Sequence, residues 1–295
     1  MLEIISFRLR FLYCNVITWS DLEGIEAYRS DSIVFKQPTF WKDLSSNFRI
    51  LRTELIIVSY IRGCYYTNWA QYRLESNGAF LPEDIASNLC THILYAFASA
   101  TAEGTAIPTE WNDEAIRSRP GLYARVVNLK NINPKLKVLL AFDGGALGSK
   151  AFSIIVQSIE KRKNFTKSTI AFVRKHKFDG IVLHWNEMGK EYEHANFIKE
   201  IKEAFMKESQ FSSNEQLVLT IAGSAQKDSI DASYQVDFLA KNIDLLFLLA
   251  YDFHNGLEQT TDLPSKLYSS QKDAVDNVVS NFQKFSSIQS IFTAL

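Results

Sequence analysis

The sequence has few of the residues that interrupt regular structure, with 12 glycines and 6 prolines among its 295 residues. It also has no low-complexity tract and no internal repeat, which excludes solenoid architectures. Hydrophobic residues make up 46% of the chain and charged residues 22%. This is the composition of a globular protein, and the length allows a large core in one or two domains.

An excess of charge of either sign is missing as well. The 32 Lys and Arg residues oppose 33 Asp and Glu residues, which leaves a formal net charge of −1. Nothing in this balance indicates a nucleic-acid or anionic-membrane partner. Long apolar runs are also absent, since Leu55 to Val58 and Leu245 to Tyr251 are much shorter than the roughly 20 residues that cross a bilayer. We therefore expect neither nucleic acid nor a membrane as a partner.

The first 54 residues match no pattern that we can assign, and we treat 1–54 as an N-terminal extension. Their start is a poor secretory signal, because Glu3 stands where basic charge is expected and Arg8 and Arg10 interrupt the apolar run. Cysteine is scarce, and the odd count of three leaves the pairing open. From the residues alone, buried free thiols are the plainer interpretation.

From Leu55 onward, short apolar runs alternate with helical stretches, which is typical of parallel βα units. The predicted strands run from Leu55 to Thr67, His92 to Ala98, Lys137 to Phe142, Phe178 to Asn186, Leu217 to Ala222 and Asp244 to Asp252. The predicted helices run from Asn112 to Asn131, Ser153 to Glu160, Asn164 to His176, Tyr192 to Lys207 and Tyr234 to Asn242.

The fourth predicted strand is the most informative stretch. Because side chains alternate along a strand, one face carries Val182, His184 and Asn186. The other face carries Ile181, Leu183, Trp185 and Glu187. In a (β/α) barrel the first set points inward and leads to the C-terminal mouth, where active sites are built.

This stretch resembles the signature strand of the glycoside hydrolase family 18 chitinases, Asp-Gly-x-Asp-x-Asp-Trp-Glu. Asp179, Gly180 and Trp185 match the frame of that motif. Its second and third Asp and its catalytic Glu are replaced, in that order, by Val182, His184 and Asn186. The resemblance therefore implies a family member that has lost its catalytic acid.

Two neighbouring residues are candidate replacement acids. His184 titrates in the right range but lies two residues deeper, about 6 to 7 Å along the strand, so a core role is the simpler interpretation. Glu187 points to the other face of the strand. The side-chain amide of Asn186 offers only weak donors and does not act as a general acid.

The resemblance is nearly gapless from about Leu55 to Tyr268, and it implies a (β/α)8 TIM barrel of the family 18 type. The matching motifs are Cys64–Arg73, Leu89–Ala98, Glu110–Glu114, Asn133–Lys137 and Tyr251–His254, and within the family Gly148–Phe152 and Ser233–Asp237 point to the vertebrate chitinase-like lectins. We expect 55–295 to be an incomplete barrel, truncated after the sixth strand and its helix. Open edges of apolar strands attract association, so a protein partner that covers them is a further expectation.

The resemblance also assigns roles to single residues. It implies a disulfide between Cys64 and Cys90, which would place the chain in an oxidising, extracellular compartment. It implies sugar contacts at Tyr65, Trp69, Phe97, Trp111, Tyr251 and Asp252. A stacking Trp of the family is Gly145 here, which weakens the expected affinity. Asn164 opens a glycosylation sequon, although it could equally be a helix N-cap.

The resemblance implies no metal and no organic cofactor. We expect a non-catalytic lectin that binds chitin or N-acetylglucosamine oligomers. A weakly active chitinase with Glu187 or His184 as its acid is the first alternative. A decayed fragment without sugar binding is the second, and the unfamiliar first 54 residues are part of its support.

Overall fold

The computed structural model describes residues 61–74, 78–143, 149–185 and 191–251, together with residues 253, 263, 265 and 268. All of these belong to one compact unit of the chain. The predicted extension 1–54 lies outside the described residues.

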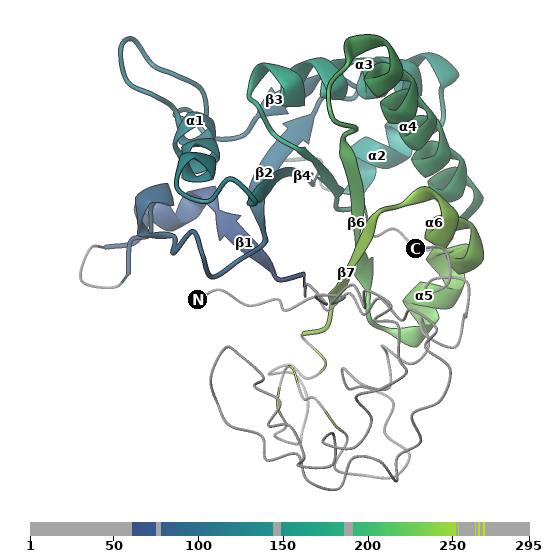
Figure 1. The fold of residues 1–295 in the computed structure, drawn as a ribbon. Coiled ribbons are helices and arrows are strands. Elements are labelled where there is room, and N and C mark those ends of the chain that lie inside the picture. Colours follow the sequence, from purple (N-terminus) through teal and green to yellow (C-terminus); the bar gives the residue numbers. More distant parts are fainter. Residues whose placement is uncertain are drawn as a thin grey trace, which may run out of the picture. The chain divides into compact units, whose positions relative to one another are not determined.

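The centre of the described part is one seven-stranded sheet (Figure 1). Its strands are β1 (Gly63–Thr67), β2 (His92–Ala100), β3 (Ala106–Pro108), β4 (Lys137–Phe142), β5 (Gly180–Leu183), β6 (Val218–Ser224) and β7 (Leu245–Leu249). The order along the sheet is β1-β2-β4-β5-β6-β7, every neighbouring pair is parallel, and the short β3 is antiparallel to β2. The sheet therefore steps along in chain order, as a barrel of βα units does.

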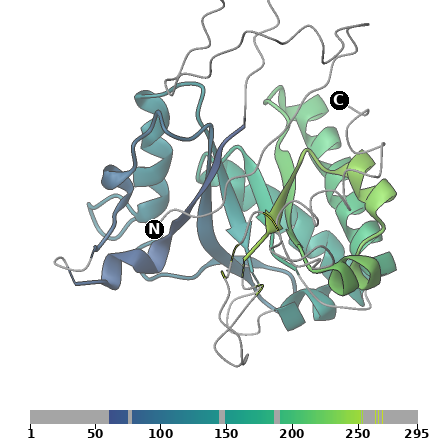
Figure 2. The same ribbon diagram turned by 90° about the horizontal axis from the view of Figure 1, so that it is seen from below.

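Helices connect the parallel strands and cover the outer face of the sheet (Figures 1 and 2). They are α1 (Leu122–Val127), α2 (Ser149–Val156), α3 (Ile159–Lys175), α4 (Glu191–Ser212), α5 (Lys227–Ser233) and α6 (Val236–Asn242), with 3-10 turns η3 (Asn68–Tyr72), η5 (Pro82–Asp84) and η6 (Asn128–Asn131). The predicted fold class is confirmed, because a curled parallel sheet with helices outside is part of a (β/α)8 barrel.

The sheet divides the core into two clusters. The outer cluster joins the sheet to the helices and contains Ile181, Leu183 and Trp185 of the signature stretch. The inner cluster lies on the concave face and contains Leu94, Leu139, Ala141, Val182, Ala222, Leu245 and Phe247. Phe247 reaches across the interior, since a Cβ added to Gly63 on β1 would lie 2.4 Å from its ring.

The predicted helix from Asn112 to Asn131 is wrong in its first half. Pro120 disfavours helical geometry at the residue before it, and Gly121 is the extended N-cap of α1, which begins at Leu122. The residues before Pro120 fold into turns instead. The carboxylate of Asp113 accepts hydrogen bonds from the backbone amides four and three residues upstream, at 3.1 and 2.9 Å.

The predicted break between the next two helices is also misplaced. Ser158 is extended and its hydroxyl accepts a hydrogen bond from the amide of Lys161, so α3 begins at Ile159. α2 ends before it, at Val156. Asn164 therefore lies inside α3, and its predicted alternative role as an N-cap is wrong. The strand β3 and the helix α5 were not predicted, because a three-residue strand and a seven-residue helix leave little periodicity.

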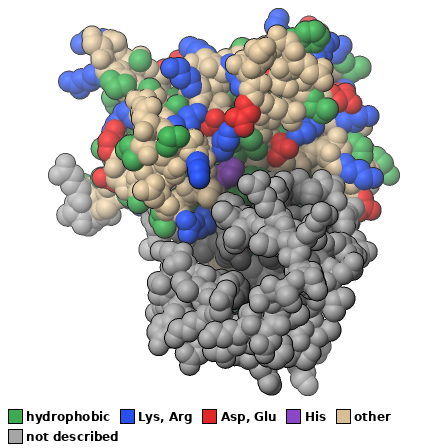
Figure 3. All heavy atoms as spheres, in the orientation of Figure 1, with side chains coloured by type: hydrophobic (Ala, Val, Ile, Leu, Met, Phe, Trp, Pro, Cys, Tyr) green, Lys and Arg blue, Asp and Glu red, His purple; other side chains and the backbone are tan. Residues whose placement is uncertain are grey.

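The surface carries charges of both signs close together. On the face drawn in Figure 3, Lys and Arg side chains are interspersed with Asp and Glu, and neither sign gathers over one region. Ion pairs join many of them, such as Arg162 with Glu200 at 2.8 Å and Arg125 with Glu83 at 2.5 Å. No helix within the described ranges is both long enough and apolar enough to cross a membrane.

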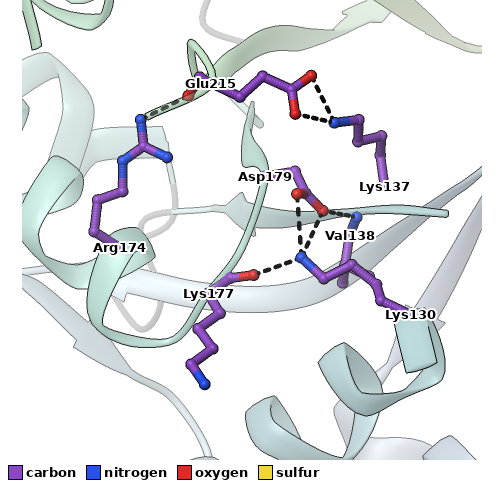
Figure 4. A network of polar contacts seen from close by, with 7 residues as sticks. All are labelled: Lys130, Lys137, Val138, Arg174, Lys177, Asp179 and Glu215. Atoms are coloured by element: carbon purple, nitrogen blue, oxygen red, sulfur yellow. Dashed lines mark hydrogen bonds and ion pairs between the residues drawn. The ribbon is translucent and has the colours of Figure 1, made fainter. Parts of the chain in front are cut away.

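At the N-terminal ends of the strands, aspartates fix the strand register. Asp179, just before β5, donates its amide to the carbonyl of Val138 at 2.8 Å, and its carboxylate accepts from the Val138 amide at 2.7 Å (Figure 4). Lys130 donates to the same carboxylate at 3.1 Å. Asp244, before β7, makes the same two hydrogen bonds with Leu219: its amide donates to the Leu219 carbonyl and its carboxylate accepts from the Leu219 amide, both at 2.8 Å. Its carboxylate also accepts from Lys202 at 2.7 Å.

We predict that Asp179→Ala lowers the free energy of unfolding by about 2 kcal/mol or more, because it leaves a backbone amide and the partly buried Lys130 without their acceptor. Glu215→Gln is the control, since Glu215 pairs with Lys137 at an exposed site (77% side-chain exposure) and should cost less than about 0.5 kcal/mol. Urea denaturation measures both. Equal losses in the two variants would contradict the register role of Asp179.

Candidate functional site

The signature strand places its side chains as the alternation predicts. Val182 belongs to the inner cluster, whereas Trp185 is buried in the outer cluster. His184 follows on the inner side, and its backbone amide donates to the carbonyl of Phe142 at 2.8 Å. The interior at the C-terminal end of β5 is therefore occupied by an imidazole.

A register shift in β2 directs a second ring toward the same point. The pairing of β2 with β4 is irregular between Ala96 and Ala98, so the alternation of inner and outer side chains is interrupted there. As a result Phe97 packs on the inner cluster and Ala98 on the outer one. The ring of Phe97 lies 5.0 Å from that of His184, edge to face.

His184 is hydrogen-bonded to the phenol of Tyr65. The distance from its Nε2 atom to the Tyr65 hydroxyl is 2.5 Å. Burial lowers the pKa of His184 from its usual 6.5 to about 4. Burial also raises the pKa of Tyr65, with a smaller contribution from Tyr251. Both groups are therefore neutral near pH 7, and the pair forms a neutral polar contact inside the barrel.

Aromatic side chains continue from this point to the surface. Trp69 stacks on Phe97 with ring centres 5.7 Å apart and an interplanar angle of 21°. Residues Asn68–Tyr72 form a 3-10 turn, in which side chains three apart are eclipsed, so Tyr72 lies in line with Trp69. The indole of Trp111 donates to the Tyr72 hydroxyl at 3.0 Å. We call Phe97, Trp69, Tyr72 and Trp111 the aromatic row.

The outer members of the aromatic row are accessible to a ligand. Trp69 is 44% exposed, Tyr72 57% and Trp111 71%. Apolar ring faces held in the open at a barrel mouth suit the C–H faces of pyranose rings. The structure thus brings together four of the predicted contact residues, namely Tyr65, Trp69, Phe97 and Trp111.

Two of the predicted contacts remain, and only Tyr251, which follows β7 in the chain, is described. Tyr251 is described and 43% exposed, and it is near enough to Tyr65 to affect its pKa. Asp252, Asn186, Glu187 and Gly145 lie outside the described residues. Their predicted roles stay predictions.

Asp179, the first residue of the signature motif, is not at this mouth. It lies at the opposite end of β5, in the register contact with Val138 and Lys130. Gly180 is equally structural, because a Cβ at this position would lie 2.0 Å from the carbonyl oxygen of Val218. Asp179 and Gly180 of the matching frame therefore hold the strand in place, whereas the replaced positions Val182 and His184 lie on the inner side.

The predicted disulfide between Cys64 and Cys90 is confirmed. Their Cα atoms are 6.0 Å apart, within the usual range for a bridge. The bond joins β1 to the segment before β2, directly behind Tyr65. Buried free thiols at these two positions are therefore the wrong interpretation. Cys14 lies outside the described residues.

The sequon at Asn164 lies on α3. Asn164 is exposed, but its amide donates to the carbonyl of Glu103 at 2.7 Å, and the hydroxyl of Thr166 is turned to the carbonyl of Arg162 at 2.9 Å. Glycosylation at Asn164 stays a prediction. In the described part of the chain, no three His, Cys, Asp or Glu side chains lie together so as to hold a metal ion.

Four residues of the site were not predicted, and all four lie within motifs that the sequence displays. Tyr72 and Asn68 belong to the 3-10 turn, where the i, i+3 spacing from Trp69 was the available signal for Tyr72. Glu110 and Asp113 flank Trp111. Their roles come from hydrogen bonds between segments about 40 residues apart, which a local pattern does not encode.

A second buried histidine lies behind the signature strand. His194 on α4 packs against the rings of Trp185 and Tyr234, with ring centres 5.2 Å away in each case. Burial lowers its pKa to about 4 as well. Its Nδ1 atom has no hydrogen-bond partner among the described residues.

Comparison with known proteins identifies the architecture. Residues 61–291 match the family model described as glycosyl hydrolases family 18. An endochitinase of Brugia malayi is 48% identical over 217 residues, which cover 73% of this chain and 43% of the relative. The chain therefore spans less than half the length of this curated relative.

Solved structures of chitinases and a pseudo-chitinase have the same fold. An immunomodulatory active chitinase from Trichuris suis superposes with a TM-score of 0.73 at 35% identity, covering 78% of this chain and 62% of that one. Human YKL-39 superposes with a TM-score of 0.70 at 37% identity, covering 77% and 62%. It is described as a pseudo-chitinase with retained chitooligosaccharide-binding properties.

We predict that the protein loses stability as the pH falls from about 6.5 to 4. His184 and His194 bind protons in the unfolded chain near pH 6.5 but in the folded chain only near pH 4, so acid favours unfolding by up to about 3 kcal/mol for each. Urea denaturation at pH 7 and pH 4.5 measures the loss.

His194→Phe keeps an aromatic ring against Trp185 and removes one titrating group. The loss of unfolding free energy between the two pH values should shrink in this variant, because the carboxylates that also titrate are unchanged. An unchanged loss would show that His194 is not buried as a neutral group.

Proposed function

Because the chain belongs to glycosyl hydrolases family 18, we propose that it binds chitin or N-acetylglucosamine oligomers without hydrolysing them. The observation that carries this proposal is the inner face of β5. There Val182 and His184 stand where the family's motif has carboxylic acids, and His184 is held by Tyr65 at 2.5 Å.

Glycoside hydrolysis requires a carboxylic acid with a raised pKa to protonate the leaving oxygen. In substrate-assisted family 18 chemistry the acetamido group of the sugar is the nucleophile, so the protein's essential contribution is that acid. Burial lowers the pKa of His184 to about 4, which makes it a poor proton donor at neutral pH. Asn186, at the position of the catalytic Glu, carries an amide.

The aromatic row supports the binding half of the proposal. Its rings extend from Phe97, which contacts His184, to the exposed Trp111. Sugar rings can stack on these side chains whether or not a catalytic acid is present. YKL-39 is a relative described as keeping chitooligosaccharide binding as a pseudo-chitinase. The same division between binding and catalysis is what we propose for this chain.

A weakly active chitinase is the second candidate. It is favoured by the 48% identity to an endochitinase and by Glu187, which follows the altered motif. This candidate requires either Glu187 to turn toward the sugar or His184 to act as the acid.

We also propose that the protein works outside the cell. The bond between Cys64 and Cys90 supports this, because such bonds persist in oxidising compartments. Within the described part of the chain, β1 and β7 are the terminal strands of the sheet, and we propose them as the place where a protein partner binds.

We expect the full chain to bind chitohexaose in isothermal titration calorimetry, and Trp69→Ala to weaken binding about fivefold or more, because an aromatic platform contributes about 1 kcal/mol. Phe211→Ala is the matched control. Phe211 is an exposed aromatic on the last turn of α4, and its removal should leave the affinity unchanged. Absence of binding by the folded wild-type chain would refute the proposal and favour a decayed fragment.

We expect no turnover of a fluorogenic chitobioside above the buffer rate at any pH from 4 to 8. Turnover that disappears in Glu187→Gln would establish the second candidate instead. Turnover that survives in Glu187→Gln and disappears in His184→Gln would assign the acid to the imidazole.

A further inference from the structure

A buried carboxylate lies beneath the aromatic row. Asp113 is fully buried (0% exposed), and it belongs to the turns that precede α1. Its carboxylate accepts hydrogen bonds from the hydroxyl of Tyr95, from the side-chain amide of Asn68 at 3.4 Å and from the backbone amides of Thr109 and Glu110 at 3.1 and 2.9 Å. All of these donors are neutral.

The donors come from three segments, and each segment carries a ring of the aromatic row. Asn68 immediately precedes Trp69, and Glu110 immediately precedes Trp111. Tyr95 lies on β2, two residues before Phe97. One carboxylate therefore holds together the three backbones that present Phe97, Trp69 and Trp111.

Further hydrogen bonds strengthen this arrangement. The side-chain amide of Asn68 also reaches the carbonyl of Phe97 at 3.3 Å and the hydroxyl of Thr109 at 3.0 Å. The hydroxyl of Thr109 donates to the same Phe97 carbonyl at 2.5 Å. The base of the row is thus a continuous network of polar groups among segments that are separated in the sequence.

Two more hydrogen bonds join the residues at the exposed end of the row. The hydroxyl of Tyr72 donates to the carboxylate of Glu110 at 2.5 Å and accepts from the indole of Trp111 at 3.0 Å. Two exposed rings are thereby held in one orientation before any ligand arrives. Rings fixed in this way lose less side-chain freedom on binding than free rings do.

We propose that Asp113 is a positioning residue for oligosaccharide binding, which sets the distance between the Trp69 and Trp111 platforms, and that Tyr72 is a further member of the binding row. This inference rests on the proposed function. A purely structural role is the alternative, because Asp179 and Asp244 also bind backbone amides. Those two lie at the opposite end of the strands and bind no segment that carries a ring of the aromatic row.

The test is the dependence of affinity on oligomer length. Calorimetry with chitotriose and chitohexaose should show that the full wild-type chain gains affinity with length, because the longer ligand contacts more of the row. In Asp113→Asn we expect about a tenfold loss for chitohexaose and less than a twofold change for chitotriose. Asp179→Asn is the matched control, and it should leave both affinities unchanged while lowering the stability.

Tyr72→Phe is the second variant, for the case that Asp113→Asn does not fold. It removes one exposed hydroxyl and keeps the ring, so the melting temperature should be unchanged. We expect a loss of about threefold or more for chitohexaose and a shift of the Trp111 indole N–H resonance in NMR spectra.

The outcomes separate the two proposals. If the folded wild-type chain binds neither oligomer, the proposed function is wrong, and the positioning role for sugar is wrong with it. If the wild-type chain binds and the folded variants keep its length dependence, the positioning role alone is refuted. An equal loss for both oligomers in Asp113→Asn would show a general structural role and would also refute it.

Discussion

The site depends on the register of β5 between its two neighbours. Side chains alternate along a strand, so a slip by one residue would turn His184 to the helices and Trp185 into the barrel. Two contacts prevent that slip. Asp179 exchanges two hydrogen bonds with Val138 on one side, and Gly180 lies so close to the backbone of Val218 on the other that no side chain fits.

The N-terminal and C-terminal ends of the strands therefore have different roles. At the N-terminal ends of the strands, Asp179 and Asp244 bind backbone amides and lysines and contribute to stability. At the C-terminal ends, His184 and Tyr65 form a neutral pair, and the aromatic row leads away from it. A carboxylate is again the organising group under the row, but there Asp113 joins segments that carry rings. The two networks are thus separate, so a variant at Asp179 can lower the stability without removing a contact of the aromatic row.

The sequence was sufficient for the strand order and for the two faces of the signature strand, because a period of two over a buried run is a strong signal. The sequence also predicted the disulfide between Cys64 and Cys90, although only through the family resemblance. It was insufficient where tertiary contacts override local pattern. The register shift that turns Phe97 inward and the capture of upstream amides by Asp113 leave no periodicity to detect. Helix starts were misplaced for a different reason, because local signals were overlooked: the Ser158 side chain caps α3 at the amide of Lys161, and α1 begins only after Pro120.

The central claim is that this barrel holds an oligosaccharide and leaves it intact. Native mass spectrometry of the full chain after prolonged incubation with chitohexaose tests both halves in one spectrum. The account predicts a complex whose added mass is that of the whole hexamer, with no shorter oligomers in solution. A complex with dimers or trimers, or their release into solution, would contradict the loss of catalysis. A folded protein that carries no sugar would contradict the binding site.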